Sequence, residues 1–555
     1  MPRVPTISQL AAGSLALGLA ACAPPPAPPE APPRPRPARV SPAVGEGHPR
    51  LVVAVVIDQL GSWVLERYLP HLDPEGALRR ATREGVYFER SVYPYASTFT
   101  APGHAAIFTG RPPSDTGIVA NSSIDPRTGE ERTSVEDEQS PVFGDETKTG
   151  SPRPLRVPTV GDALKAAHPN AKVVALSTKD RASILPGGHR ADLAVWYDYH
   201  LPGYTTSRYY ADLLPEWLAD YRKSHPISAL LKPWVPADPQ LLRAVVGEDD
   251  AEGEGDYQGL GRTFPHDPEV ATKPYSVLRI FPQMTEYMLE LAGALASAEQ
   301  LGADDQVDLL CLSISGLDYT GHTFGPESWE YLDHFRRADR ALGRLIDALD
   351  EHHGPIAVLI TADHGITPTP AKNPAGGGRI YPYEVTALAK RLVPRPEMVR
   401  LYERPFVYLD PELSSEERAA AVAALEAGLT EHPGVHRAVG VERAAALRSS
   451  ADPIDRAIGL SIAPNMPGEV YVVPAENWVV DEDHPRGGGT THGTPWRLDR
   501  EVPVIVWRGG APPQVVTEPV SQLRVAPTLA ALLGVSPPEG VVEPPLEAAL
   551  PAAAR

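Results

Sequence analysis

Six ionisable side chains in this sequence have the types and the spacing of a metal-binding site. Asp318 and His322 are four residues apart, so on a helical turn both side chains face the same way. Three carboxylates and three imidazoles suit two divalent metal ions, and zinc accepts such oxygen and nitrogen ligands. The chain has only 2 Cys, which excludes a cysteine-rich zinc site. The candidate ligands are Asp58, Asp318, His322, Asp363, His364 and His492.

Each of these motifs also has an ordinary structural explanation when it is taken alone. Asp318 with His322 could be a local ion pair or a cap, and Asp363-His364 could cap a turn or a helix. His492, in a short Thr-His-Gly segment, carries little information alone. Only the joint placement of these residues favours a metal site.

The segment Ser97–His104 is a candidate nucleophile loop. It precedes Ala105–Gly110 and is typical of a turn that leads into a helix, whose free N–H groups and positive dipole end suit a phosphate. Thr100 places an alcohol just before that helix. An unassisted alcohol is a poor nucleophile near neutral pH, but a zinc ion can stabilise its alkoxide. Taken alone, such a threonine is usually a capping residue.

An α/β fold with a largely parallel sheet is predicted to position these side chains. Continuous apolar runs are typical of buried parallel strands and occur at Leu51–Ile57, Val173–Leu176, Val307–Ile314, Ile356–Ile360, Val470–Val473 and Val502–Trp507. Helical patterns lie between some of them, at Pro282–Glu299, Glu327–Leu349 and Ser415–Leu429, the last with Ser414 or Ser415 as its N-cap.

In such a sheet, ligands gather at the carboxyl ends of the strands. Polar residues follow four of the apolar runs. Asp58 comes after the first run, Lys179 and Arg181 after the second, Asp318 and His322 after the third, and Asp363 and His364 after the fourth. This repetition at four separate strand ends predicts one shared site.

Two long segments interrupt this scheme, at about 190–275 and 371–465, and are predicted to be insertions that cap the strand ends.

Cys311 lies within an apolar run, so a buried structural cysteine is expected there. The net charge of -20 argues against a nucleic-acid partner or a general binder of anionic membranes.

The N-terminus has the pattern of an export signal followed by a tether. Residues 1–21 carry one charge and a short apolar run that is too short to span a membrane. The ending Leu19-Ala20-Ala21-Cys22 resembles a bacterial lipoprotein signal, in which the cysteine becomes the lipidated first residue; the alternative is an ordinary secretory signal with a chance cysteine. Residues 22–50 are rich in proline, which predicts an extended polyproline tether. Residues 51–555 form the expected single catalytic domain.

The ordered set of motifs resembles the alkaline phosphatase superfamily. The set comprises Asp58, Thr98-Phe-Thr100-Ala-Pro-Gly-His104, Lys179-Asp-Arg181, Asp318-x3-His322 with Phe-Gly-Pro326, Asp363-His364-Gly365 and His492-Gly-Thr494. More narrowly, it is similar to the phosphate-irrepressible, PafA-type bacterial alkaline phosphatases, which use a threonine nucleophile. The resemblance spans about residues 51–535 and implies a three-layer sandwich with a mostly parallel central sheet and capping insertions.

The resemblance implies a role for each matching residue. One zinc ion would be held by Asp318, His322 and His492. The other would be held by Asp58, Asp363 and His364, with Thr100 beside it as the nucleophile that becomes a phosphothreonine. Asn121, Lys179 and Arg181 would contact the phosphoryl oxygens.

These residues also bear on the substrate. Two zinc ions with Asn121, Lys179 and Arg181 suit the dianion of a phosphate monoester, whereas superfamily phosphodiesterases lack this Lys/Arg arrangement. A Cys/Ser-x-Pro-x-Arg sulfatase pattern is absent at Thr100–His104. The alternatives are a phosphodiesterase or nucleotide pyrophosphatase on the same scaffold, and a lipoprotein that binds phosphate ligands without turnover.

The resemblance also implies a cellular location, and the segment after Asn121 differs from that of the family. The protein is expected outside the cytoplasm, in the periplasm, held to the outer membrane by a lipid on Cys22, since no Asp follows that cysteine. Relatives often carry an aromatic residue soon after the asparagine, whereas this chain has Asn121-Ser-Ser-Ile-Asp125.

Overall fold

The computed structural model describes residues 49–466, 468–481 and 488–551. Its centre is a ten-stranded sheet with the order β19-β2-β18-β11-β1-β10-β7-β8-β9, and β20 pairs with β2. The strands are β1 (Leu51–Ile57), β2 (Val86–Val92), β7 (Val173–Ser177), β8 (Leu193–Asp198), β9 (Gly203–Thr205), β10 (Asp308–Ile314), β11 (Ile356–Thr361), β18 (Glu501–Trp507), β19 (Gln514–Val516) and β20 (Val520–Ser521). Most neighbouring pairs are parallel, which confirms the predicted sheet.

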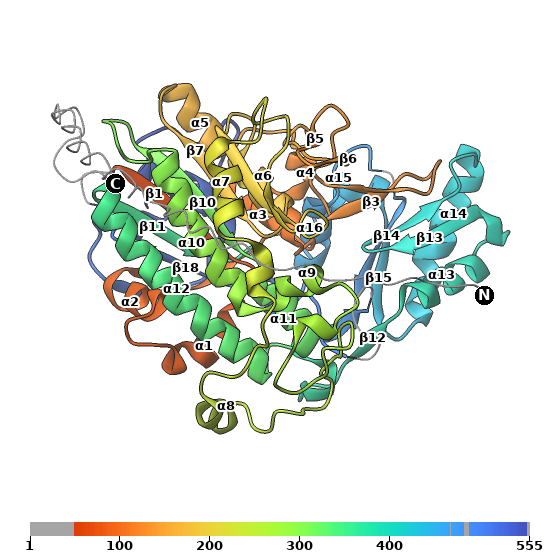
Figure 1. The fold of residues 1–555 in the computed structure, drawn as a ribbon. Coiled ribbons are helices and arrows are strands. Elements are labelled where there is room, and N and C mark those ends of the chain that lie inside the picture. The colour runs from red at the N-terminus through yellow and green to blue at the C-terminus, as the bar shows by residue number, and fades with distance from the viewer. Residues whose placement is uncertain (1–48, 467, 482–487, 552–555) are drawn as a thin grey trace, which may run out of the picture. The chain divides into compact units, whose positions relative to one another are not determined.

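The sheet lies between two layers of helices because its strands are apolar on both faces. In β1 the side chains of Leu51, Val53 and Val55 pack into one buried core, and those of Val52 and Ala54 pack into the other. One core is covered by α1 (Ser62–Tyr68), α2 (Ala77–Glu84), α10 (Pro282–Ala298) and α12 (Trp329–His353). The other is covered by α3 (Thr100–Thr109), α5 (Val160–Ala167), α6 (Arg181–Gly187) and α18 (Val525–Leu532). Figure 1 shows α10 and α12 side by side in front of the sheet. This is the predicted three-layer sandwich.

Two of the six predicted parallel strands are not parallel. The run Val502–Trp507 lies in the sheet as β18 but pairs antiparallel with both β11 and β2. The run Val470–Val473 belongs to β16 (Val470–Pro474), which pairs antiparallel in a separate sheet. Apolar content alone therefore identified buried strands but not their direction, because an antiparallel strand that is covered on both faces is equally apolar.

The predicted helices are present. They are α10, α12 and α14 (Ser415–Gly428). Ser414 is the N-cap of α14, where its side chain accepts from the Glu417 N–H and the Glu417 side chain accepts from the Ser414 N–H.

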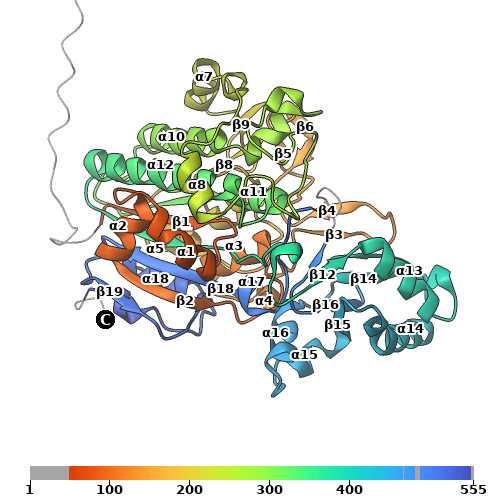
Figure 2. The same cartoon turned by 90° about the horizontal axis from the view of Figure 1, so that it is seen from below.

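The two interrupting segments differ from the expected boundaries. The first begins with β8, which pairs parallel with β7, and β9 follows, so the chain leaves the central sheet only after Thr205. The second extends beyond the expected residue 465, because β13 (Val399–Glu403), β14 (Phe406–Leu409) and β15 (Val435–Gly440) form a four-stranded sheet with the later β16, in the order β13-β14-β16-β15. This sheet packs with α14 and with α13 (Pro382–Leu392) in a core of its own. Figure 2 shows this part, in cyan, beside the central sheet.

Two features of the chain concern membranes. Among the described residues, no helix is both long enough and apolar enough to cross a bilayer. The predicted signal of residues 1–21, the lipidated Cys22 and nearly all of the 22–50 tether lie outside the described residues.

Candidate active site

The structure brings the six predicted metal ligands into two groups of three. All of the ligand atoms within a group lie within 4.8 Å of one another, and all six residues are buried. The groups are Asp318, His322 and His492, and Asp58, Asp363 and His364. The partition is the one that the family resemblance implied.

The strand ends explain how residues so far apart in the sequence meet. Asp58 directly follows β1, and Asp363 follows β11, which is the parallel neighbour of β1. Strand β10, on the other side of β1, leads into α11 (Gly316–Phe324). Asp318 and His322 lie on the same face of this helix, with Asp318 Oδ1 3.1 Å from His322 Nε2. His492 lies in the segment that precedes β18.

Backbone carbonyls orient the three histidines. The Nδ1 atom of His322 lies 2.9 Å from the Thr490 carbonyl, that of His364 lies 3.0 Å from the Gly365 carbonyl, and that of His492 lies 2.7 Å from the Thr98 carbonyl. Such a bond places the proton on Nδ1 and leaves Nε2 as the metal-binding atom. Burial lowers the pKa of both His364 and His492, which favours the neutral imidazole that a metal requires.

The donor atoms of the second group fit a bound cation. The buried atoms Asp58 Oδ1, Asp363 Oδ2 and His364 Nε2 have no hydrogen-bond partner among the described residues. Buried carboxylates and imidazoles normally have partners, and a divalent cation would satisfy all three atoms at once. Two carboxylate oxygens and one imidazole nitrogen form a set that zinc accepts.

Thr100 is the first residue of α3, whereas the sequence placed it just before a helix, and its side chain is buried. The helix packs directly against the strand end that carries Asp363: a Cβ on Gly103 would collide with the Asp363 backbone carbonyl. A glycine is therefore needed at position 103 to let the nucleophile loop approach the ligand loop this closely.

Lys179 connects Thr100 to both groups of candidate metal ligands. Its Nζ lies 2.6 Å from Asp58 Oδ2, 2.6 Å from Asp318 Oδ2 and 3.2 Å from Thr100 Oγ1. Burial would lower the pKa of Lys179, but the carboxylates of Asp318 and Asp58 raise it above its ordinary value. The lysine is therefore a fixed positive charge beside the Thr100 hydroxyl.

Asn121 and Arg181 lie at the same cavity. The Asn121 Oδ1 accepts from the Ala101 N–H at 2.9 Å, so its side-chain NH2 group is left to donate to a ligand. Arg181 begins α6, and its buried Nε has no hydrogen-bond partner among the described residues. Both residues, with Thr100 and Lys179, line a cavity of about 290 Å³.

The segment after Asn121, which departs from the family pattern, forms a short hairpin. Strand β3 (Ser122–Ile124) pairs antiparallel with β4 (Glu131–Thr133). Polar side chains from this hairpin line the cavity at Ser122, Glu131 and Thr133. The chain therefore presents polar groups at this edge of the site.

Sequence reasoning assigned no role to several residues that touch the site. Gln59, with a φ of 74°, donates from its backbone to Asp363 and from its side chain to Asp318, and so connects the two metal groups. Arg404, from the second interrupting segment, donates to the His492 carbonyl at 2.6 Å and stacks on Phe99. Neither residue belongs to a motif, so only the fold could reveal them.

His104 belongs to the nucleophile motif but had no assigned function. Its Nδ1 lies 2.8 Å from the Thr100 carbonyl and 3.3 Å from Asp363 Oδ2, and its Nε2 lies 2.9 Å from Ser313 Oγ. The imidazole thus contacts both the Thr100 backbone and Asp363, a candidate metal ligand.

Comparison with known proteins agrees with this geometry. A family model described as "Type I phosphodiesterase / nucleotide pyrophosphatase" matches residues 52–495. The chain belongs to this family. Within it, the chain is similar to PafA-type alkaline phosphatases, in agreement with the resemblance that the motifs carry.

Three relatives define this similarity. Alkaline phosphatase PhoV of Synechococcus elongatus is 31% identical over 91% of this chain and 94% of its own. Alkaline phosphatase PhoK of Sphingomonas is 30% identical over 89% of this chain and 90% of its own. The crystal structure of alkaline phosphatase PafA matches with a TM-score of 0.84 at 27% identity, over 92% of this chain and 100% of that chain. The chain therefore has an alkaline-phosphatase-like fold and is an enzyme of that type. This excludes the alternative of a protein that binds phosphate without turnover.

Proposed function

We propose that this protein is a zinc-dependent phosphomonoesterase that works through a phosphothreonine at Thr100. The observation that carries the proposal is the position of the Thr100 hydroxyl, which lies at the start of a helix and 3.2 Å from a buried, positively charged Lys179. The two ligand groups beside it fit two zinc ions. Bound there, the ions would supply Lewis-acid stabilisation of the charge on the attacking and leaving oxygens.

The residues of this chain account for binding and attack. The Asn121 amide and the Arg181 guanidinium supply N–H donors for the free oxygens of a monoester dianion, and the positive charge of Lys179 lies beside them. The Thr100 hydroxyl loses its proton and Oγ1 forms a bond to phosphorus, while the bond between phosphorus and the alcohol oxygen breaks on the opposite side and that oxygen takes up a proton. Water then cleaves the phosphothreonine and restores the Thr100 hydroxyl.

The second candidate is a phosphodiesterase or nucleotide pyrophosphatase, which the description of the matching family favours. It would keep every metal ligand and Thr100. A diester carries one charge fewer and a second ester group, so the buried Lys179 and the partly buried Arg181 favour the monoester instead.

Kinetics on residues 51–555 loaded with zinc test the proposal. We expect higher kcat/KM for phenyl phosphate than for the matched diester, loss of activity on chelation, and loss of most of kcat in Thr100→Ala with the metals retained. A preference for the diester would contradict the monoesterase, and full activity of Thr100→Ala would contradict the covalent route.

We also propose that the enzyme works outside the cytoplasm, anchored by a lipid on Cys22 after removal of residues 1–21. The Pro-rich residues 22–50 would then hold the catalytic domain away from the outer membrane. Expression of the full chain with radiolabelled palmitate should label the wild type and not Cys22→Ser. Equal labelling, or no labelling of either protein, would contradict the anchor.

A further inference from the structure

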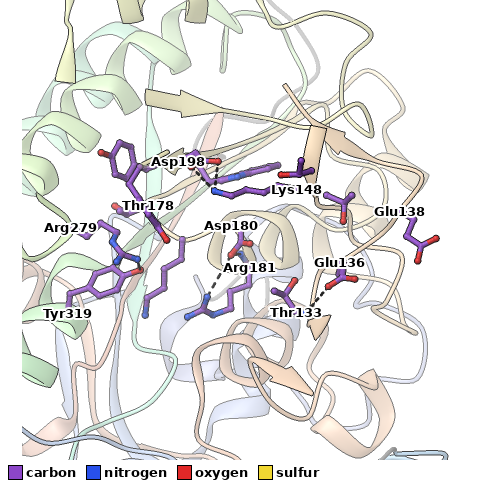
Figure 3. A pocket seen from close by; sticks show the side chains of 16 residues that line it. Thr133, Glu136, Glu138, Lys148, Thr178, Asp180, Arg181, Asp198, Arg279 and Tyr319 are labelled. Carbon is purple, nitrogen blue, oxygen red and sulfur yellow. Dashed lines mark hydrogen bonds and ion pairs between the residues drawn. The ribbon is translucent and has the colours of Figure 1, made fainter. Parts of the chain in front are cut away.

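A second cavity, of about 500 Å³, adjoins the active-site cavity (Figure 3). The two cavities share four wall residues: Thr133, Lys179, Arg181 and Tyr319. An alcohol joined to a phosphoryl group that contacts Lys179 and Arg181 can therefore extend into the second cavity.

The acidic groups of this cavity are either paired or lie away from Arg279. Asp180 pairs with Arg181 at 3.7 Å, and both Asp198 oxygens accept from Lys148 Nζ at 2.8 Å, which neutralises these two carboxylates. In Figure 3, Glu136 and Glu138 lie on the side of the cavity opposite Arg279. The end of the cavity near Arg279 is therefore its positive end.

Arg279 is held rigidly between two tyrosine rings. Its guanidinium carbon lies 4.8 Å from the centre of the Tyr199 ring and 4.6 Å from the centre of the Tyr319 ring. Nε donates to the Ser276 carbonyl, Nη2 to Ser276 Oγ, and Nη1 to the Tyr319 hydroxyl. A guanidinium has five N–H groups, so one remains on each terminal nitrogen.

No carboxylate within the described parts of the chain pairs with Arg279. Its charge is instead faced by aromatic rings, which leave the edge of the guanidinium for a ligand. A planar guanidinium that is already fixed in place loses little freedom when it binds a carboxylate or a phosphate through two N–H groups.

We propose that this second cavity binds the alcohol part of a phosphate monoester that carries an additional anionic group, a carboxylate or a phosphate, and that Arg279 binds this group. The proposal rests on the phosphomonoesterase function and names its substrate class. Arg279 is then a specificity-determining residue: it acts on the leaving group, whereas Lys179 and Arg181 act on the transferred phosphoryl group.

Arg279 also supports Tyr319, whose ring centre lies 5.1 Å from Lys179 Nζ. A purely structural role would therefore change the turnover of every substrate alike. The ratio of kcat/KM for two substrates separates the two roles, because a general defect cancels in the ratio.

The test compares 4-carboxyphenyl phosphate with phenyl phosphate on the zinc-loaded enzyme and on Arg279→Gln, which removes the charge and keeps a polar side chain. Arg279→Lys restores the charge. Arg243→Gln is the matched control, since Arg243 also stacks on an aromatic ring, that of Trp329, but does not line either cavity.

We expect the ratio of kcat/KM, carboxylated over neutral substrate, to fall about tenfold in Arg279→Gln, as for the loss of one hydrogen bond between charged groups. The ratio should stay within about threefold of wild type in Arg279→Lys and be unchanged in Arg243→Gln. A ratio in Arg279→Gln within twofold of wild type overturns the subsite, even if both rates fall. Failure of the wild type to hydrolyse either ester would instead contradict the phosphomonoesterase itself.

Discussion

Replacement of His104 by asparagine should weaken both metal binding and catalysis. The imidazole donates from Nδ1 to the Thr100 carbonyl, accepts at Nε2 from Ser313, and lies 3.3 Å from Asp363 Oδ2. It is fully buried, so no water can replace these contacts. The shorter asparagine side chain cannot reach Thr100 and Ser313 at the same time, and Asp363 loses the imidazole that lies against its Oδ2.

The size of the effect follows from these contacts. The loss of two buried hydrogen bonds, at about 1 kcal/mol each, lowers the free energy of unfolding by about 2 kcal/mol. The loss of a group that orients a metal ligand typically costs about 10–100-fold in metal affinity or activity. We therefore expect zinc affinity, measured by competition with a chelator, and kcat/KM to fall together by about that factor.

A buried histidine outside the site provides the matched control. His266 lies 2.7 Å from Glu330 and 3.2 Å from the Leu260 carbonyl, and it contacts none of the six ligands. His266→Asn should lower stability without changing zinc affinity. If His104→Asn behaves like this control, with reduced stability and unchanged zinc affinity, the positioning role of His104 is refuted.

Two further predictions concern charge. Lys179→Met should lower kcat/KM for phenyl phosphate at least about tenfold more than for its diester, because the monoester dianion gains more from the lysine charge; paired kinetics measure this. Burial raises the pKa of Asp339 to about 7, and Asp73 adds to this effect. The folded state therefore keeps a proton that the unfolded state releases near pH 4, so the free energy of unfolding should fall by about 3 kcal/mol from pH 4 to 7. The variant Asp339→Asn should lack this decline in chemical denaturation.

Each of these predictions has an outcome that contradicts it. Equal losses for monoester and diester in Lys179→Met would remove the lysine as the discriminating group. Equal pH dependence of unfolding in the wild type and in Asp339→Asn would mean that this carboxyl group is ionised when folded, despite an Oδ2 atom that has no hydrogen-bond partner among the described residues.

The sequence was sufficient to predict the residues whose chemistry is local. Asp58, Asp363 and His364 each follow a buried apolar run, and the carboxyl ends of parallel strands meet at one edge. The side chains of Asp318 and His322 share a helix face because of their spacing. These signals depend on periodicity and burial, which a single sequence contains.

Other features depend on contacts between distant segments. The direction of β18 is set by its neighbours β11 and β2, and its own apolar residues are compatible with either direction. Arg404 reaches the His492 carbonyl only because the second interrupting segment folds against the central sheet. Arg279 gains its environment from Tyr199 and Tyr319, which come from different elements. Such pairings leave no local pattern in the chain.

The most direct test of the central claim is the chemical identity of the covalent intermediate. The zinc-loaded enzyme is mixed with phenyl phosphate, quenched in acid within one turnover, digested, and analysed by mass spectrometry. We predict a phosphoryl group on Thr100 in the wild type and none at that position in Thr100→Ala. Turnover with no phosphorylated residue, or with the phosphoryl group on a different side chain, would contradict the account.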